Sequence, residues 1–414
     1  MAKLSKTTKT VIIAAAVLLV LGAVLLVLLM TKPAEETSSG SGDSTVSADG
    51  TAEISAPDTG ETSADESSSA ADPALTINAK EQENVLKMEV SNQTGSFSFD
   101  RASREVSSTD DDGNVTTSTQ YYWTSPQLDG IDRNDSTIGA FVRSMAGLSA
   151  SSMVEENAAD LDKYGLAEPL STVKVTFDDG ASSEVLFGIR NPAASNYVYC
   201  RVNGSNDVMQ VSYYSTGSAF YDIKDFVSLV LTEAYDANNP QELEYLTIER
   251  KDLSEPVEIE YMFDVAAESE DENSVVTTFN SHRITSPITA ELDTTSGQTI
   301  AYGLYSLSAA SCAYIDPTDE ELAQTGLDDP YCKISFKYGG KARVLLLGNE
   351  VRSAADEDSE DSLSTVTGYY AMFEGGRLIY TISTSNAPWY TFKVQDIMSR
   401  RPISPYIYTV DKLT

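Results

Sequence analysis

The sequence is poor in the side chains that most often carry chemistry. It contains one histidine, His282, and three cysteines, Cys200, Cys312 and Cys332, in 414 residues. A single histidine excludes most histidine-based metal sites and allows at most one Ser-His-Asp triad. The cysteines are odd in number and lack Cys-x-x-Cys spacing, so a disulfide framework is not expected. We interpret them as small buried apolar residues, and pairing of Cys312 with Cys332 stays open because spacing alone does not fix connectivity.

Basic residues are scarce as well. Lys and Arg number 28 against 63 Asp and Glu, which gives a formal net charge of -35. Phosphate contacts need clustered Lys and Arg, so this balance excludes a typical nucleic-acid-binding protein. High solubility and low non-specific adhesion are the safer inferences from such a charge. The length suggests two globular domains with additional segments.

Motifs of known chemistry are also missing. The sequence has no G-x-x-x-x-G-K-[ST] loop and no G-x-S-x-G nucleophile elbow. STDDDGNVTTST at residues 108–119 resembles a calcium loop, but Thr119 stands where the bidentate Glu is needed, so we interpret it as a hairpin turn. The acidic DEDSED at residues 356–361 is interpreted as a solvated loop, and His282 as an ordinary surface or half-buried residue. We predict no catalytic residues, no cofactor and no metal.

One long apolar run stands near the N-terminus. It begins at Val11, ends at Met30 and contains no charged residue over these 20 positions. As a helix that rises about 1.5 Å per residue, it would span about 30 Å, the hydrocarbon thickness of a bilayer. A cleaved signal peptide is the alternative, but its apolar region is normally about 7–15 residues long and ends in a small-residue cleavage site. We predict an uncleaved transmembrane helix.

The charges beside this run indicate its orientation. Lys3, Lys6 and Lys9 precede it, whereas only Lys32 follows closely. Positive charge stays on the cytoplasmic side. We therefore predict a cytoplasmic stub at residues 1–10 and a single-pass protein of the cell membrane, with its C-terminal domains outside the cytoplasm.

Residues 31–78 differ in composition from the rest of the chain. They are mostly Ser, Thr, Ala, Gly and acidic residues, without any aromatic side chain. Such a segment buries too little apolar surface to offset the entropy lost on ordering. We predict a disordered tether that separates the folded part from the membrane.

Beyond the tether the sequence repeats itself. Gly-Leu-x-x-Pro occurs at residues 165–169 and again 161 residues later, at 326–330. Thr-Ser-Pro occurs at residues 124–126 and 285–287, with the same offset. These matches predict two tandem copies of one domain.

Each copy shows the same order of patterns. Apolar residues at helical spacing follow each Thr-Ser-Pro, namely Ile138, Phe141, Val142, Met145 and Leu148 in the first copy and Ile300, Leu304 and Leu307 in the second. Runs with strand period follow each Gly-Leu-x-x-Pro, as in VKVTF and KISFKY. We predict an α+β fold with repeats at residues 79–233 and 234–408 and a tail at 409–414. Each repeat is expected to hold an antiparallel sheet packed by one main helix and one short helix.

Gly-Leu-x-x-Pro has a structural explanation. The short helix before it is expected to begin at Asn157 in the first repeat and at a Thr318–Glu321 capping box in the second. A glycine suits the left-handed position that ends a helix, and the next residue then packs on one five positions earlier. The expected pairs are Leu166 on Leu161 after Gly165 and Leu327 on Leu322 after Gly326. Pro169 and Pro330 then force extended backbone into the following strand.

These motifs together resemble a bacterial family, the domain of unknown function 4340. The likeness consists of an aromatic residue and a proline, a helix, D-L-x-x-Y-G-L-x-x-P, and a glycine and a tyrosine in the strands that follow. The matching residues in the first repeat are Trp123, Pro126, Asp160, Leu161, Tyr164, Gly165, Leu166, Pro169, Gly188 and Tyr197. The second repeat keeps Pro287, Leu322, Gly326, Leu327 and Pro330, but has Ile284 for the tryptophan and Thr325 for the tyrosine.

The resemblance implies a single-span envelope protein associated with ABC-type transport systems of the gliding-motility kind. It carries over no catalytic residue. We predict a binding or scaffold protein rather than an enzyme, with a protein partner in the envelope such as an ABC transporter permease. The alternatives are a module that captures or senses a cell-wall polymer or peptide in the cleft between the repeats, and an envelope hydrolase.

Overall fold

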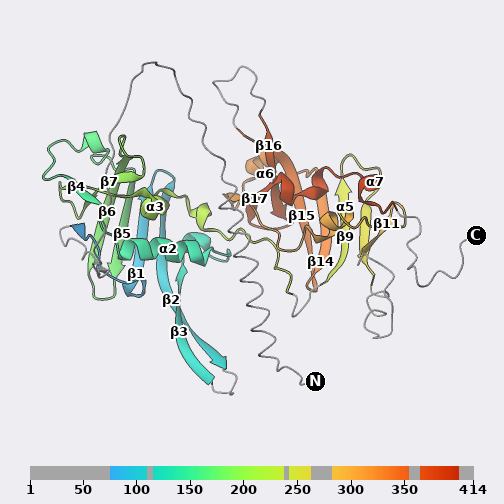
Figure 1. Cartoon of the computed structure of the whole chain (residues 1–414), viewed down its shortest axis with the longest axis horizontal. Coiled ribbons are helices and arrows are strands. Elements are labelled where there is room, and N and C mark those ends of the chain that lie inside the picture. Colours follow the sequence, from blue (N-terminus) through green and yellow to red (C-terminus); the bar gives the residue numbers. More distant parts are fainter. Residues whose placement is uncertain (1–74, 110–114, 237–241, 263–281, 354–363, 401–414) are drawn as a thin grey trace, which may run out of the picture. The chain divides into compact units, whose positions relative to one another are not determined.

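The structure is a computed structural model, and it describes residues 75–109, 115–236, 242–262, 282–353 and 364–400 (Figure 1). The predicted stub, transmembrane run and tail lie outside these residues, as do the calcium-loop residues 110–114 and the acidic loop at residues 356–361. In the described ranges, no helix is long and apolar enough to cross a membrane. The last residues assigned to the tether belong to the fold, because Asn78 Nδ2 donates a 2.7 Å hydrogen bond to Met145 O.

The first of two sheets contains eight antiparallel strands in the order β3-β2-β1-β5-β6-β7-β8-β4. Most neighbouring strands are consecutive in the sequence, but β1 pairs with β5, and β4 lies at the far edge beside β8. The strands are β1 (Val85–Asn92), β2 (Gly95–Thr109), β3 (Val115–Thr124), β4 (Ser152–Glu155), β5 (Ser171–Phe177), β6 (Ser182–Arg190), β7 (Tyr197–Val202) and β8 (Val208–Ser212).

The second sheet contains nine strands in the order β12-β11-β10-β9-β14-β15-β16-β17-β13. Apart from the two-residue β12, this order corresponds strand by strand to that of the first sheet, with β11 in the place of β3 and β13 in the place of β4. The strands are β9 (Leu243–Arg250), β10 (Val257–Tyr261), β11 (His282–Ser286), β12 (Ala290–Glu291), β13 (Ser311–Ile315), β14 (Cys332–Tyr338), β15 (Lys341–Arg352), β16 (Val366–Phe373) and β17 (Leu378–Ser383).

The predicted α+β class is wrong, because the described residues form mostly antiparallel sheet with short helices. The longest α-helix among them is α2, with 12 residues. The α-helices are α2 (Asp135–Ala146), α3 (Tyr213–Thr216), α5 (Ser296–Tyr302), α6 (Asp319–Thr325) and α7 (Val394–Ile397). The 3-10 helices are η2 (Gln82–Asn84), η3 (Pro126–Leu128), η4 (Asp162–Tyr164), η5 (Gly217–Phe220), η6 (Ile223–Phe226), η7 (Thr384–Asn386) and η8 (Pro388–Tyr390).

The helix predicted from the apolar spacing forms in full in the first repeat but ends early in the second. In the first, α2 forms as predicted: Asn134 caps it by accepting from Thr137 N at 3.1 Å, and its apolar stripe is buried. In the second, α5 ends at Tyr302, just before Gly303, a residue of low helix propensity. Leu304 and Leu307 are buried, but they follow the helix instead of extending it.

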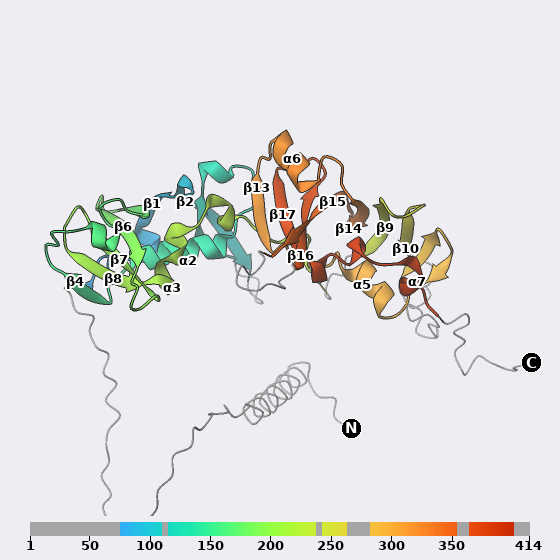
Figure 2. The same ribbon diagram turned by 90° about the horizontal axis from the view of Figure 1, so that it is seen from above.

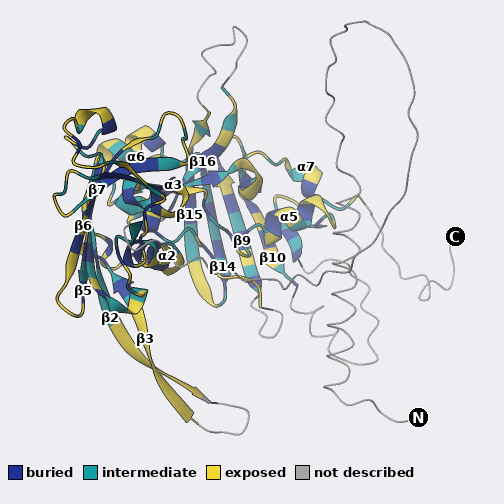
Figure 3. Cartoon of the chain, turned by 60° about the vertical axis from the view of Figure 1, so that its left-hand side comes forward, coloured by how far each residue is buried: buried dark blue, intermediate teal, exposed yellow. Residues whose placement is uncertain are grey.

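The main hydrophobic core lies on one face of each sheet. Along β5 and β14, buried residues alternate with more exposed ones, as the two-residue period of a strand dictates (Figure 3). Val175 and Ile334 on these strands belong to one continuous cluster of buried side chains that also includes the stripe of α2 and Ile300 of α5. Burying this stripe and the facing strand residues is the dominant favourable contribution to folding.

The opposite face of each sheet carries a smaller cluster. In β7, Tyr199 points away from its neighbours Val198 and Cys200, and it packs with Tyr164 and Leu166. The second sheet repeats the arrangement, with Leu327 against β15–β17 residues. Figure 2 shows α6 and α5 on opposite sides of the second sheet. Gly-Leu-x-x-Pro therefore belongs to the segment that covers the second face.

The helix stop predicted for Gly-Leu-x-x-Pro is present in both repeats. Gly165 and Gly326 are left-handed, with φ of 65° and 70°. The next leucine donates its backbone N–H to the carbonyl five residues earlier: Leu166 to Leu161 at 3.0 Å and Leu327 to Leu322 at 2.9 Å. These are the hydrogen bonds of a Schellman motif.

The helix starts agree with the prediction in one repeat only. Thr318 and Glu321 form the expected capping box at the start of α6. Asn157 caps no helix, because it has φ of 48° and η4 begins at Asp162. With a three-residue 3-10 turn in place of an α-helix, the first repeat keeps the stop of the motif without its predicted start.

Each left-handed glycine lies against a second glycine in the neighbouring strand. Gly188 in β6 packs so closely on this turn that an added Cβ would overlap the carbonyl oxygen of Tyr164 and lie 3.1 Å from Gly165 C. Gly348 in β15 has the same relation to Thr325 O and Gly326 C. The pairing of β6 with β7, and of β15 with β16, shifts register at these positions. The turn that contains Gly-Leu-x-x-Pro therefore packs on a β-bulge of the neighbouring strand. This close contact requires glycine at the bulge, because any side chain there would clash with the turn.

Replacing either strand glycine by alanine tests this docking. We expect Gly188→Ala and Gly348→Ala each to lower the free energy of unfolding by at least about 3 kcal/mol, at the upper end of the range for overpacking, because the obstructing atom is backbone. Denaturant unfolding of the full chain measures the effect. The matched control is Gly139→Ala in α2, where a Cβ meets nothing closer than 3.9 Å and helix propensity favours alanine. Equal stability of all three variants would contradict the docking.

Candidate functional site

The two sheets are joined by a connection, residues 227–233, that is hydrogen-bonded to a loop on each side of it. At its first end, Ser228 N donates to Asp132 O at 2.8 Å, in the loop that leads into α2. At its other end, Leu231 N donates to Leu307 O at 2.8 Å, after α5. The connection is therefore held by backbone hydrogen bonds along its length.

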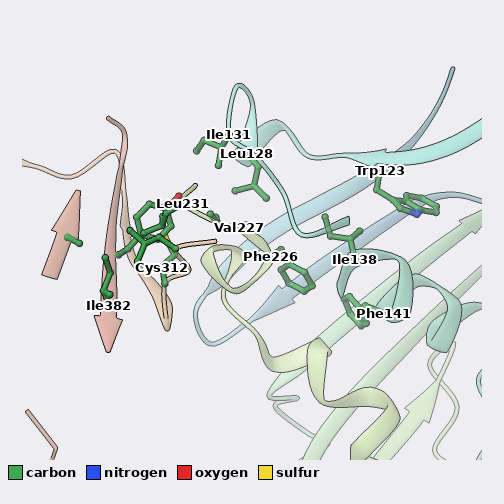
Figure 4. Close-up of a cluster of buried hydrophobic side chains, with 14 of the residues drawn as sticks. Trp123, Leu128, Ile131, Ile138, Phe141, Phe226, Val227, Leu231, Cys312 and Ile382 are labelled. Carbon is green, nitrogen blue, oxygen red and sulfur yellow. The ribbon is translucent and has the colours of Figure 1, made fainter. Parts of the chain in front are cut away.

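Buried side chains accompany these hydrogen bonds. Val227 and Leu231 of the connection are buried and belong to the continuous core. Figure 4 shows Leu231 beside Cys312 and Ile382 of the second sheet, while Phe226 and Val227 lie toward Leu128 of the first. The core thus continues from one sheet into the other through the connection.

One arginine adds a side-chain contact across the same junction. Arg377, just before β17, forms a two-fold ion pair with Asp316, with Nε–Oδ1 and Nη2–Oδ2 distances of 2.6 and 2.7 Å. Its remaining Nη1 donates to Asp129 O of the first repeat at 2.7 Å. The guanidinium lowers the pKa of Asp316 through its hydrogen bonds. Because a guanidinium donates in fixed directions, the Asp316 pair orients Arg377 toward Asp129.

A groove with a volume of about 770 Å³ lies beside this junction. Its walls come from the loop and helix start at residues 130–135, from the connection, and from Lys341 and Arg343 at the start of β15. A smaller groove of about 290 Å³ shares the loop and the connection and reaches Arg377. We call the larger one the junction groove, and it is our candidate binding site.

Charges of both signs line the junction groove. Lys341 Nζ lies 2.7 Å from Glu233 Oε1, and this hydrogen bond lowers the pKa of Glu233. Arg343 Nη1 donates to Leu231 O at 3.0 Å. Arg133 Nε lies 3.7 Å from Asp135 Oδ1, yet it is buried without a hydrogen-bond partner within the described residues.

These basic side chains gather in a chain with few of them. The groove holds Arg133, Lys341 and Arg343 opposite Asp132, Asp135 and Glu233, so its formal charges balance while the whole chain carries -35. Carboxylate or phosphate groups can therefore approach it with less repulsion than other surfaces offer. The groove suits a ligand or protein segment that carries both charges.

The residues singled out in the sequence lie elsewhere. None of the predicted repeat-motif residues is among those that line the junction groove. Trp123 is buried in the core near Ile138 (Figure 4), and Pro126 opens η3. Pro287 follows β11 after a cis peptide bond. The motif residues therefore shape the sheets, while the groove is built by residues that no sequence motif marks.

The cysteines and acidic residues form no further site in the part of the chain that the structure describes. Cys200, Cys312 and Cys332 are free and buried, so the disulfide left open by the sequence is not formed. Burial raises the pKa of the Cys200 and Cys332 thiols to about 12 and that of Cys312 to about 11. Across the described ranges, no group of three or more His, Cys, Asp or Glu side chains could hold a metal ion.

The single histidine is not a surface residue, contrary to the sequence interpretation. His282, at the start of β11, is only 2% exposed, and its Nε2 donates to Leu243 O at 2.8 Å. The rings of Tyr261 and Tyr302 lie 5.3 and 6.0 Å from its imidazole, between ring centroids. Desolvation lowers the pKa of His282, and the hydrogen bond to Leu243 raises it by a smaller amount. His282 is a neutral member of the core.

A family model described as Domain of unknown function (DUF4340) matches residues 123–330, half of the chain. The chain belongs to this family. The matched DUF4340 segment begins at Trp123 in β3, ends at Pro330 and includes the whole connection between the sheets. The predicted family is confirmed, while two tandem copies and an association with transport systems stay predictions. No curated protein and no solved structure matches the chain.

The buried histidine predicts a pH dependence of stability. Its pKa is lowered in the folded state, so below the ordinary value of about 6.5 the unfolded chain binds a proton that the folded chain does not. Stability should therefore fall as the pH drops below that value, by at most about 1.4 kcal/mol per pH unit for one proton.

Denaturant unfolding of the full chain between pH 7.5 and 5 measures this dependence. The change His282→Gln removes the titrating group and keeps a side-chain donor for Leu243 O, so we expect a smaller slope in the variant. Identical slopes for the two proteins would show that His282 does not carry the dependence.

Proposed function

We propose that the protein is a membrane-anchored, extracytoplasmic binding and scaffold protein, accessory to an ABC-type transport or envelope complex. The observation that carries the proposal is the junction groove, whose walls come from the loop and helix start at residues 130–135, from the connection and from the start of β15. An occupant would contact all three parts at once. Because the connection is hydrogen-bonded to the loop at Asp132 on one side and to Leu307 on the other, such an occupant meets a surface ordered before binding, which reduces the entropy lost on association.

Two features of the sequence and topology support the wider proposal. The apolar run at residues 11–30, with lysines before it, supports a place in the cell membrane with the N-terminus in the cytoplasm. The equal strand order of the sheets supports two tandem copies of one domain. We assign the chain no catalytic role, and the ABC association rests on resemblance alone.

Co-purification tests the partner. Full-length protein taken from gently solubilised membranes should bring with it the ATPase and permease of a transporter. The variant Lys341→Glu reverses an exposed charge of the groove, and we expect it to reduce recovery of these subunits about tenfold, the effect of losing one charge-assisted hydrogen bond.

The control for this experiment is Lys251→Glu. Lys251 is similarly exposed and also pairs with an acidic residue, Asp329, at 2.7 Å, but it lies outside the junction groove. Full recovery is expected with this variant. Wild-type protein that always emerges without transporter subunits contradicts the accessory role, and equal loss in both variants contradicts the groove as its site.

Capture of a cell-wall peptide or polymer is the second candidate. The balanced charges of the groove favour it, since wall peptides carry free amino and carboxyl groups. Sedimentation of the detergent-solubilised chain with purified wall fractions measures binding. We expect Lys341→Glu to weaken this binding and Lys251→Glu to leave it unchanged. Absence of wild-type binding would remove this candidate without affecting the first.

A further inference from the structure

The first sheet continues beyond its other strands as a two-stranded ribbon. β2 pairs with β1 only through residues 95–100, whereas it pairs with β3 from Asp100 to Thr109 without a register shift. In Figures 1 and 3 the outer part of β2 and β3 extends away from the sheet, and Figure 3 shows it as exposed. A two-stranded hairpin is marginally stable in water unless further strands or packing support it.

The outer strand of this ribbon, β3, forms one edge of the sheet and is paired with β2 alone in the described strand order. Its sequence, VTTSTQYYWT, contains neither a charged residue nor a proline. Natural proteins usually protect edge strands by charges, prolines, bulges or short length, because an open edge offers unpaired N–H and C=O groups to other chains. β3 has none of these protections over its ten residues.

The other sheet edges of the same molecule are protected. β4 has four residues, includes Glu155 and shifts register within its pairing. β13 has five residues and also shifts register, after Cys312. β12 has only two residues. The contrast within one chain indicates that the edge of β3 is covered by another strand when the protein functions.

We propose that the edge of β3 binds a second copy of this chain, with the two β3 strands antiparallel and related by a two-fold axis. A two-fold interface needs a surface that complements itself. A strand of Thr, Ser and Tyr meets this need, because Thr–Thr and aromatic–Thr pairs across an antiparallel ladder are favourable. Such pairing would continue each eight-stranded sheet into the next. The inference is independent of the proposed binding role of the groove.

Charge favours a second copy at this edge over other surfaces. With -35 on each chain, two copies repel each other wherever their acidic surfaces meet. At the proposed interface the nearest charged strands would be the two β2 strands, three strand spacings or about 14 Å apart. This exceeds the screening length of about 8 Å at physiological ionic strength.

The orientation of the pair follows from charge as well. The acidic residues 110–112 adjoin one end of the ribbon in the sequence. Antiparallel pairing places these ends at opposite ends of the interface, whereas parallel pairing would bring them together. On β2, Arg101 and Arg104 lie 4.9 and 5.6 Å from the ring centroids of Tyr121 and Tyr122, so their charges rest on the faces of the ribbon and leave the edge open.

Sedimentation equilibrium of the full chain in density-matched detergent tests the proposal. We expect a monomer–dimer equilibrium that the double variant Thr116→Lys/Ser118→Lys weakens by at least about tenfold, through like charges across the interface. The matched control is Val106→Lys/Ser108→Lys. It places the same charges on the same face one strand further in, at the residues paired with Ser118 and Thr116, and it should dimerise like the wild type.

Cysteine cross-linking gives a second readout. The native cysteines in the described residues are buried, so a single cysteine introduced at Thr117, Thr119 or Tyr121 would be the reactive one. We expect an oxidised dimer with at least one of these variants. A wild-type chain that stays monomeric overturns the proposal, as does a dimer that the β3 lysines leave intact, since that dimer would use another surface.

Discussion

Both sheets depend on the contact of a left-handed turn with a strand glycine. Gly188 and Gly348 allow the carbonyls of Tyr164 and Thr325 to lie directly against strand backbone. A larger residue would hold the turn away from the sheet and leave its second face uncovered. Tyr199 and its counterparts in the second sheet would then lose the leucine that buries them. Each sheet can therefore be covered on both faces because its strand glycine has no Cβ atom.

Strand β15 combines two tasks along its length. Leu345 and Leu347 in its middle pack into the main core, whereas Lys341 and Arg343 at its start reach the junction groove. Structural residues and groove residues therefore share an element but occupy different parts of it. This arrangement allows the charge at Lys341 to vary without disturbing the packing, since exposed side chains contribute little to stability.

Sequence reasoning succeeded where local chemistry decides the structure. Gly165 and Gly326 were recognised because the signal for a helix end lies within a few residues. The apolar stripe of α2 was recognised because its spacing is visible within one short stretch of sequence. β3 was not recognised as a ten-residue strand, since its polar side chains show no apolar alternation. The groove was not predicted either, because Arg133 and Lys341 are over two hundred residues apart and meet only through the fold. The α+β class gave the helices too much weight beside the two large sheets, and in the second repeat it extended a helical pattern past Gly303, where α5 has already ended.

The connection between the sheets determines whether the two halves of the chain can fold as independent domains. The sequence divides the repeats between residues 233 and 234, at the end of the connection. Its hydrogen bonds to Asp132 and to Leu307, and the buried side chain of Leu231, hold material from both sides of that division. A cut there would expose apolar surface on each half. The two predicted copies are therefore expected to unfold together, because a change that disrupts one removes packing that supports the other.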